Sequence, residues 1–156
     1  MLASTLEPPI LVIDAGIAAF TVLGGSINKA TERAWAGWRK THAELFAPQL
    51  WRFEVTSMLR KANALGDIKT HEAQDGLAAI LAFNVTLVAP DDELCRSALR
   101  WAERLKQSAA YDGFYLALAS RLQAEFWTTD RRLANAARQS GVRWTHWIGE
   151  LETKDG

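Results

Sequence analysis

The sequence predicts an α/β fold, a three-layer α/β/α sandwich around a central, mainly parallel sheet. Short apolar runs alternate along the chain with longer segments of helical period, which is the pattern of a parallel sheet covered by helices. The first run, Ile10–Ile13, is apolar throughout and rich in β-branched residues, as is typical of a strand buried on both faces. The 156 residues, 49% of them hydrophobic, suffice for one core. We therefore expect one domain over residues 1–156, with residues 1–9 as a short lead-in.

The first third of the chain is expected to form a strand, two helices and a second strand. After the strand at Ile10–Ile13, residues 16–23 have a helical pattern that ends at a pair of glycines. Residues 27–41 place apolar side chains along one helical stripe, which predicts the second helix. Residues 45–47 are a short apolar run before a proline, and we expect a strand there.

The middle of the chain repeats this alternation. Residues 50–65 predict a helix that ends at a glycine, and residues 70–83 predict another helix. Residues 86–89 are an apolar run that a proline interrupts, which indicates a strand. Three acidic residues then open the helix expected up to residue 106, where the helix dipole favours negative charge.

The last third is expected to supply the central helix. Residues 109–122 are apolar on nearly all sides, which predicts a buried helix. A strand at residues 126–128, a helix at residues 131–139 and a strand at residues 142–148 complete the series.

Composition limits the possible functions and the cellular compartment. Lys plus Arg and Asp plus Glu each number 18, which argues against a globally basic nucleic-acid binder but allows a local basic patch. The single cysteine, Cys95, excludes an internal disulfide and is expected to be a small buried hydrophobe. Trp38 and Trp51 lie on apolar helix stripes, so we expect both in the core. Because no targeting or membrane-spanning segment is apparent, a cytoplasmic protein is expected.

Four acidic residues stand out because their surroundings are apolar. Asp14 ends the run at Ile10–Ile13, and Asp130 follows the predicted strand at residues 126–128. Glu54 and Asp112 lie within apolar helical stretches. An unpaired charge taken from water is costly, and carboxylates that converge raise one another's pKa unless a cation lies between them.

Each of these carboxylates also has a purely structural explanation. Asp14 and Asp130 precede predicted helices, so either could be an N-cap. Asp112 lies near the start of its helix, where negative charge is favoured. Glu54 is different, because it is in mid-helix and no basic residue lies three or four positions away. Asp112 has no basic residue at those spacings either, so a cation is the simplest partner for both.

The expected geometry supports a metal site. In open α/β sheets, ligands bind outside the carboxyl ends of the strands, and Asp14 and Asp130 follow two such ends. Neighbouring helices could bring Glu54 and Asp112 to the same place. An all-oxygen carboxylate site suits Mg²⁺ or Mn²⁺ rather than zinc. Such ions coordinate phosphate oxygens and activate water, which indicates phosphodiester hydrolysis.

Four stretches of the chain resemble the PIN-domain family, and within it the VapC-type toxins of toxin–antitoxin pairs. They occur in family order and are Leu11–Ala15, Ala47–Val55, Tyr111–Ala119 and Trp127–Leu133. The resemblance implies an Mg²⁺- or Mn²⁺-dependent endoribonuclease, commonly a homodimer, that a small cognate VapB-type antitoxin inhibits. It also implies the residues that act as catalytic metal ligands, namely Asp14, Glu54, Asp112 and Asp130. In such proteins the residue that corresponds to Thr128 helps to hold water or metal. Ala15 is a departure, because many relatives carry a small hydroxyl residue there.

An RNA substrate requires positive charge near the site. Arg131 and Arg132 directly follow the last aspartate, and Lys29 and Arg33 share one face of the helix at residues 27–41. Ordinary solvated surface charge is the alternative explanation. We favour that alternative for Lys29 and Arg33, and we leave both explanations open for Arg131 and Arg132.

Three functions therefore compete. The first is a metal-dependent endoribonuclease, the toxin of a type II toxin–antitoxin system. The second is a PIN-fold module that binds RNA or protein without cutting, against which the complete set of four acids argues. The third is a carboxylate-metal phosphohydrolase that acts on DNA or on a small phosphate ester.

Overall fold

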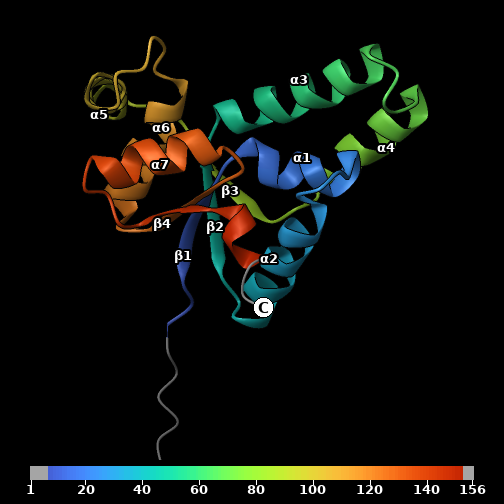
Figure 1. The fold of residues 1–156 in the computed structure, drawn as a ribbon, viewed down its shortest axis with the longest axis horizontal. Helices are drawn as coiled ribbons and strands as arrows, with labels where there is room; N and C mark the ends of the chain where they lie inside the picture. The colour runs from blue at the N-terminus through green and yellow to red at the C-terminus, as the bar shows by residue number, and fades with distance from the viewer. Residues whose placement is uncertain (1–6, 153–156) are drawn as a thin grey trace, which may run out of the picture.

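The computed structural model describes residues 7–152, so most of the predicted lead-in, residues 1–6, lies outside the described residues. A five-stranded sheet with the order β3-β2-β1-β4-β5 forms the middle of the molecule (Figure 1). Every strand pair in it is parallel. The strands are β1 (Ile10–Ile13), β2 (Glu44–Pro48), β3 (Val85–Val88), β4 (Glu125–Thr128) and β5 (Thr145–Trp147). The predicted α/β class with a parallel sheet is confirmed.

The helices form a layer on each face of this sheet. Because crossovers between parallel strands are right-handed, the steps from β1 to β2 to β3 put their helices on one face, and the steps to β4 and β5 put theirs on the other. Figure 1 shows these two groups on opposite sides of the sheet. The first group is α1 (Ala15–Leu23), α2 (Asn28–Lys40), α3 (Leu50–Ala64) and α4 (Thr70–Leu81). The second group is α5 (Asp92–Arg104), α6 (Tyr111–Leu122) and α7 (Arg131–Gln139), and a 3-10 helix (Ile148–Leu151) follows β5.

The connections between the strands change direction between β1 and β4. These two strands are neighbours in the sheet, but the chain leaves β1 toward β2 and leaves β4 toward β5. Their following helices, α1 and α7, therefore depart toward opposite faces. The point at which the connections diverge is the usual ligand site of an open parallel sheet.

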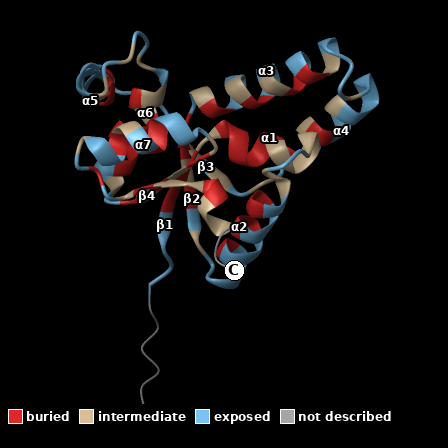
Figure 2. Cartoon of the chain, in the orientation of Figure 1, coloured by how far each residue is buried: buried red, intermediate tan, exposed pale blue. Residues whose placement is uncertain are grey.

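The core lies between the sheet and the inner faces of α1 and α6 (Figure 2). The side chains of Ile13, Ile17 and Phe126 are fully buried. Helix α6 packs against β1, β2 and β4, and its residues from Tyr115 to Ala119 are all buried, which confirms the predicted central helix. Trp38 and Trp51 are also buried, as predicted.

Several expected boundaries differ from those observed. The expected helix at residues 109–122 begins only at Tyr111. The strand expected at residues 142–148 is reduced to Thr145–Trp147, because the backbone N–H of Val142 donates to the carbonyl of Ala137 at 3.0 Å and ties this segment to the end of α7. The prediction for Cys95 was wrong. It lies exposed on α5, because that helix buries only the stripe that contains Leu94, Ala98 and Ala102.

No helix within residues 7–152 combines the length and the apolar character that crossing a membrane requires.

Candidate active site

Asp14 lies at the carboxyl end of β1 and binds groups from two elements. Its Oδ1 accepts a hydrogen bond from the backbone N–H of Ile17 at 3.0 Å, so Asp14 is the N-cap of α1. Its Oδ2 accepts hydrogen bonds from the Thr128 hydroxyl at 2.5 Å and from the Thr129 backbone N–H at 2.9 Å. The carboxylate therefore joins the end of β1 to the end of β4.

Thr128 is the fully buried link between two of the acids. Its Oγ1 donates to Asp14 and accepts the backbone N–H of Asp130 at 2.9 Å. The two strand ends also approach closely at Gly16. A Cβ there would lie 2.1 Å from the Oγ1 of Thr129, so a side chain at residue 16 would force the Thr129 side chain to move.

Asp130 is the N-cap of α7, as Asp14 is of α1. Its Oδ1 accepts the backbone N–H groups of Arg132 at 2.8 Å and Leu133 at 3.2 Å. The structural explanation that the sequence offered for both aspartates is therefore confirmed. Capping uses only one oxygen of Asp130, since no described residue donates a hydrogen bond to its Oδ2.

Glu54 projects from α3 toward α6 and is partly buried. Its Oε1 accepts a hydrogen bond from the hydroxyl of Tyr115 at 2.7 Å. Burial and the adjacent Glu54 raise the pKa of this hydroxyl well above its ordinary value of 10.0, so Tyr115 is a permanent donor. Sequence reasoning missed Tyr115, although it lies three residues after Asp112 and therefore on the same face of α6.

Asp112 lies in the first turn of α6. Its Oδ2 accepts a hydrogen bond from the side-chain amide of Gln107 at 2.9 Å. Gln107 belongs to the segment between α5 and α6, and the sequence contained no signal that separated it from any other loop glutamine. Glu54 and Asp112 thus each have one neutral donor rather than a cationic partner.

The four carboxylates share one electrostatic environment. Burial raises the pKa of Glu54, and the negative charges of Asp14 and Asp112 raise it further, against the hydrogen bond from Tyr115. Burial raises the pKa of Asp112 in the same way, and the charge of Asp130 adds to the rise. Burial raises the pKa of Asp14 despite the hydrogen bonds that it accepts from Thr128, Thr129 and Ile17. The fold therefore places Asp14 and Asp112 close enough to Glu54, and Asp130 close enough to Asp112, for their charges to interact.

The oxygen donors at this place fit a hard divalent cation. Among residues 7–152, no three or more His, Cys, Asp or Glu side chains form a ready-made metal cage. Mg²⁺ does not require one, because it usually keeps several waters and binds through one or two carboxylates. Glu54 and Asp112 each present a second oxygen to which no described residue donates a hydrogen bond. A cation bound there would also offset the burial and the neighbouring negative charges that raise their pKa values.

The four basic residues that the sequence singled out lie in two different places. Arg131 and Arg132 are exposed in the first turn of α7, directly after Asp130, and the guanidinium of Arg131 lies 4.9 Å from the ring centre of Trp147. Lys29 and Arg33 instead line a shallow hollow that none of the four carboxylates lines. Arg33 donates there to the carbonyl of Leu151 at 3.0 Å.

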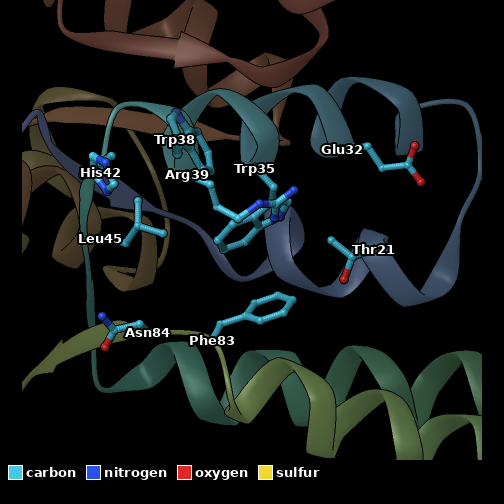
Figure 3. Close-up of a pocket in the computed structure, with 10 residues that line it drawn as sticks. Thr21, Glu32, Trp35, Trp38, Arg39, His42, Leu45, Phe83 and Asn84 are labelled. Carbon is cyan, nitrogen blue, oxygen red and sulfur yellow. The ribbon is translucent and has the colours of Figure 1, made fainter.

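A separate hollow of about 650 Å³ lies between α2 and the segment that leads into β3. Figure 3 shows the rings of Trp35, Trp38 and Phe83 at this hollow, with Arg39 and His42 near its edge. None of the four carboxylates lines it. We therefore assign it no part in the chemistry of the acidic site.

Comparison with known proteins identifies the fold. Among solved structures, PAE2754 from Pyrobaculum aerophilum has a TM-score of 0.67 at 18% identity, over 95% of this chain and 90% of that chain. A toxin–antitoxin complex from Klebsiella pneumoniae contains a chain with a TM-score of 0.62 at 14% identity, over 88% of this chain and 97% of that chain. VapC20 of Mycobacterium tuberculosis, described as a toxin that cleaves the sarcin–ricin loop, has a TM-score of 0.59 at 16% identity, over 81% of this chain and 94% of that chain.

At these identities the structural neighbours, which include VapC toxins, show the fold alone. None of the curated proteins is similar enough in sequence to count as a match. The sequence model of the PIN domain, however, matches residues 11–139, which contain all four acids. The chain therefore belongs to the PIN-domain family.

Proposed function

We propose that this protein is a Mg²⁺- or Mn²⁺-dependent endoribonuclease that acts as the toxin of a type II toxin–antitoxin pair. The observation that carries this proposal is the group of four carboxylates, Asp14, Glu54, Asp112 and Asp130. Asp14 and Asp130 follow the carboxyl ends of the neighbouring strands β1 and β4, the charges of Asp14 and Asp112 act on Glu54, and the charge of Asp130 acts on Asp112. Family membership and the fold shared with a sarcin–ricin-loop-cleaving toxin support an RNA substrate.

The chain's own residues position the donor oxygens in this proposal. Tyr115 orients Glu54 and Gln107 orients Asp112, and each of these hydrogen bonds uses one oxygen and leaves the other available to a metal ion. Thr128 holds Asp14 and the backbone of Asp130 in fixed relation. When bound, the divalent ion supplies charge neutralisation for the scissile phosphate and a water of lowered pKa. Arg131 and Arg132, which are exposed directly after Asp130, would contact the flanking phosphates of the RNA in this proposal.

An antitoxin partner and a dimeric state belong to the same proposal. One of the structural neighbours is a chain of the toxin–antitoxin complex from Klebsiella pneumoniae, and two others, VapBC2 from Rickettsia felis and FitAB, are bound to DNA fragments. We propose a small VapB-type antitoxin as the inhibitor, a homodimer as the active form and the cytoplasm as the place of action. Loss of RNA cleavage on addition of the protein encoded next to this gene, with a shift to a larger complex in gel filtration, would test the antitoxin.

The central test is cleavage of single-stranded RNA by the purified protein with Mn²⁺ or Mg²⁺. Glu54→Gln and Asp112→Asn keep an acceptor for Tyr115 and Gln107 but remove the negative charge. We expect each to lower kcat/KM by more than about 100-fold. Loss of a group that only hydrogen-bonds to a metal ligand lowers activity less, by about 10- to 100-fold. Asp75→Asn, a change of the same kind at an exposed position on α4, should leave the rate unchanged.

The outcome of this test also separates the competing functions. Undiminished cleavage in both site variants would contradict the proposal. RNA binding by the wild-type protein without cleavage under either metal would favour the non-cutting module. Faster cleavage of single-stranded or flap DNA than of RNA would favour the DNA phosphohydrolase.

A further inference from the structure

A third hollow, of about 720 Å³, lies on the outer side of α3. Its lining includes Arg52, Phe53, Thr56 and Arg60 from α3 and Leu87 from β3. The side chain of Phe53 is 76% exposed, which is unusual for a large aromatic ring. Figure 2 shows the exposed residues along the outer side of α3.

This hollow and the acidic site lie at the same edge of the sheet, where the strands have their carboxyl ends. The carboxyl end of β2 leads directly into α3, and β3 pairs with β2 in parallel. The end of β3 is therefore two strand spacings, roughly 10 Å, from the end of β1 that carries Asp14. Phe53 directly precedes Glu54, whose side chain turns to Tyr115 while the Phe53 ring stays in solvent.

The lining of the hollow combines positive charge with an aromatic face. No acidic residue lines it, and no described carboxylate forms an ion pair with Arg52 or Arg60. The guanidinium of Arg60 donates only to the neutral side chain of Asn63, at 2.9 Å. An exposed aromatic face that shares a hollow with two cations suits an unpaired nucleotide, whose base stacks on the ring while its phosphates meet the arginines.

We propose that Phe53, Arg52 and Arg60 form a subsite that binds one unpaired nucleotide of the RNA substrate beside the scissile bond. This inference rests on the proposed function, because it extends the same substrate along the edge of the sheet. The base stacks on Phe53, and Arg52 and Arg60 hold the phosphates on either side of it. The subsite recognises single-stranded nucleic acid by shape and charge rather than by base identity, since its named contacts reach no base edge.

The test of stacking is a steady-state comparison on a short single-stranded RNA. Phe53→Ala should raise KM about 5- to 150-fold, the range for the loss of one base–aromatic stack, and leave kcat within about two-fold. Phe53→Tyr should restore the wild-type KM because it restores the ring. Leu99→Ala, which removes another large exposed side chain from α5, should leave KM unchanged. An unchanged KM in Phe53→Ala would overturn the proposal.

The test of phosphate contact is the salt dependence of RNA binding, measured by fluorescence anisotropy in EDTA so that no cleavage occurs. The logarithm of the binding constant falls as the logarithm of the salt concentration rises. Arg52→Gln and Arg60→Gln should each make this slope less steep by about 0.7, the value for one phosphate of a single strand. Arg39→Gln, at an exposed position of α2 outside the hollow, should leave the slope unchanged. Equal slopes for all three variants would overturn the phosphate contacts.

Two further results keep this inference distinct from the proposed function. If the wild type cuts no RNA but Phe53→Ala still weakens binding in EDTA, the endoribonuclease proposal fails and the subsite stands. In the other result, gel filtration shows that Phe53→Ala dissociates a dimer. If the RNA affinity of this variant then equals that of the dissociated wild-type protein, Phe53 belongs to an interface between two copies of the chain, and the subsite proposal is overturned.

Discussion

Asp14 illustrates how one carboxylate can serve the fold and the site together. One of its oxygens caps α1, and the other receives the hydroxyl of Thr128 and the backbone of Thr129. These bonds oppose the effect of burial, which nevertheless raises its pKa. A substitution at Asp14 therefore disturbs folding and chemistry at once, whereas Glu54 and Asp112, each with a single donor, report on chemistry more cleanly.

Thr128 should prove to be the residue that stabilises this arrangement. Thr128→Val keeps the shape of the side chain but removes the donor to Asp14 and the acceptor for the Asp130 backbone. Because Thr128 is fully buried, we expect the free energy of unfolding to fall by about 1–3 kcal/mol, measured by urea denaturation. Thr128→Ser keeps both bonds and should lose much less. Equal stability of the valine variant and the wild type would contradict this role.

At the scale of elements, the close packing of α5 on α6 determines where Asp112 lies. Arg121 of α6 makes two hydrogen bonds to Asp91, the N-cap of α5, at 2.8 and 2.9 Å. The guanidinium of Arg121 lowers the pKa of this exposed carboxylate to about 2. At the other end of the pair, a Cβ on Gly113 would lie 2.3 Å from the backbone oxygen of Ala98. The first turn of α6, which carries Asp112, can approach α5 only because residue 113 is glycine.

Gly113→Ala should therefore separate the two helices. We expect it to lower the free energy of unfolding by about 1–3 kcal/mol, the usual cost of overpacking, and to lower the rate of RNA cleavage because Asp112 moves. Gly37→Ala is the matched control, since no atom lies within 4 Å of a Cβ at this exposed position in α2. It should stabilise the protein by about 0.5–1 kcal/mol. Similar effects of the two substitutions would contradict the packing argument.

At the scale of the whole molecule, a formal net charge of zero coexists with a local group of four carboxylates, Asp14, Glu54, Asp112 and Asp130. The pKa values of Glu54 and Asp112 are raised above their ordinary values of 4.5 and 3.8. In the pH range between the ordinary and the raised values, the folded protein holds protons that the unfolded chain has released. The metal-free protein should therefore lose stability as the pH rises through this range and regain it as the pH falls.

A divalent cation should restore the stability that the metal-free protein loses as the pH rises to neutral. At a free concentration 100 times its Kd, Mg²⁺ or Mn²⁺ would add about 2.7 kcal/mol to the stability of the protein. That corresponds to a rise in Tm of roughly 5–10 °C for a chain of this size, which differential scanning fluorimetry can measure. The double variant Glu54→Gln, Asp112→Asn should show a flatter dependence on pH and little response to metal. An equal rise in Tm for the double variant and the wild type would place the metal elsewhere.

Features that depend on residues within about one helical turn or one strand could be predicted from the sequence. The apolar run at Ile10–Ile13 predicted a buried parallel strand. The apolar residues on all sides of Leu116 predicted a central helix, since a helix that is buried on all sides requires apolar residues on all sides. The capping of α1 by Asp14 and of α7 by Asp130 was also foreseeable, because a cap depends only on the next three residues. The burial of Cys95 was mispredicted because residue type alone does not say which stripe of a helix faces the core.

The pairing of residues distant in the sequence was decided only by the tertiary structure. The sequence by itself determined the α/β class, the identity of the four acids and the likeness to the PIN-domain family. It did not determine that Tyr115 meets Glu54, that Gln107 meets Asp112, or that Phe53 stays in solvent beside them. Those contacts depend on the order of the strands and on the direction in which each crossover leaves the sheet. Both are set by the packing of the whole core rather than by any local run of residues.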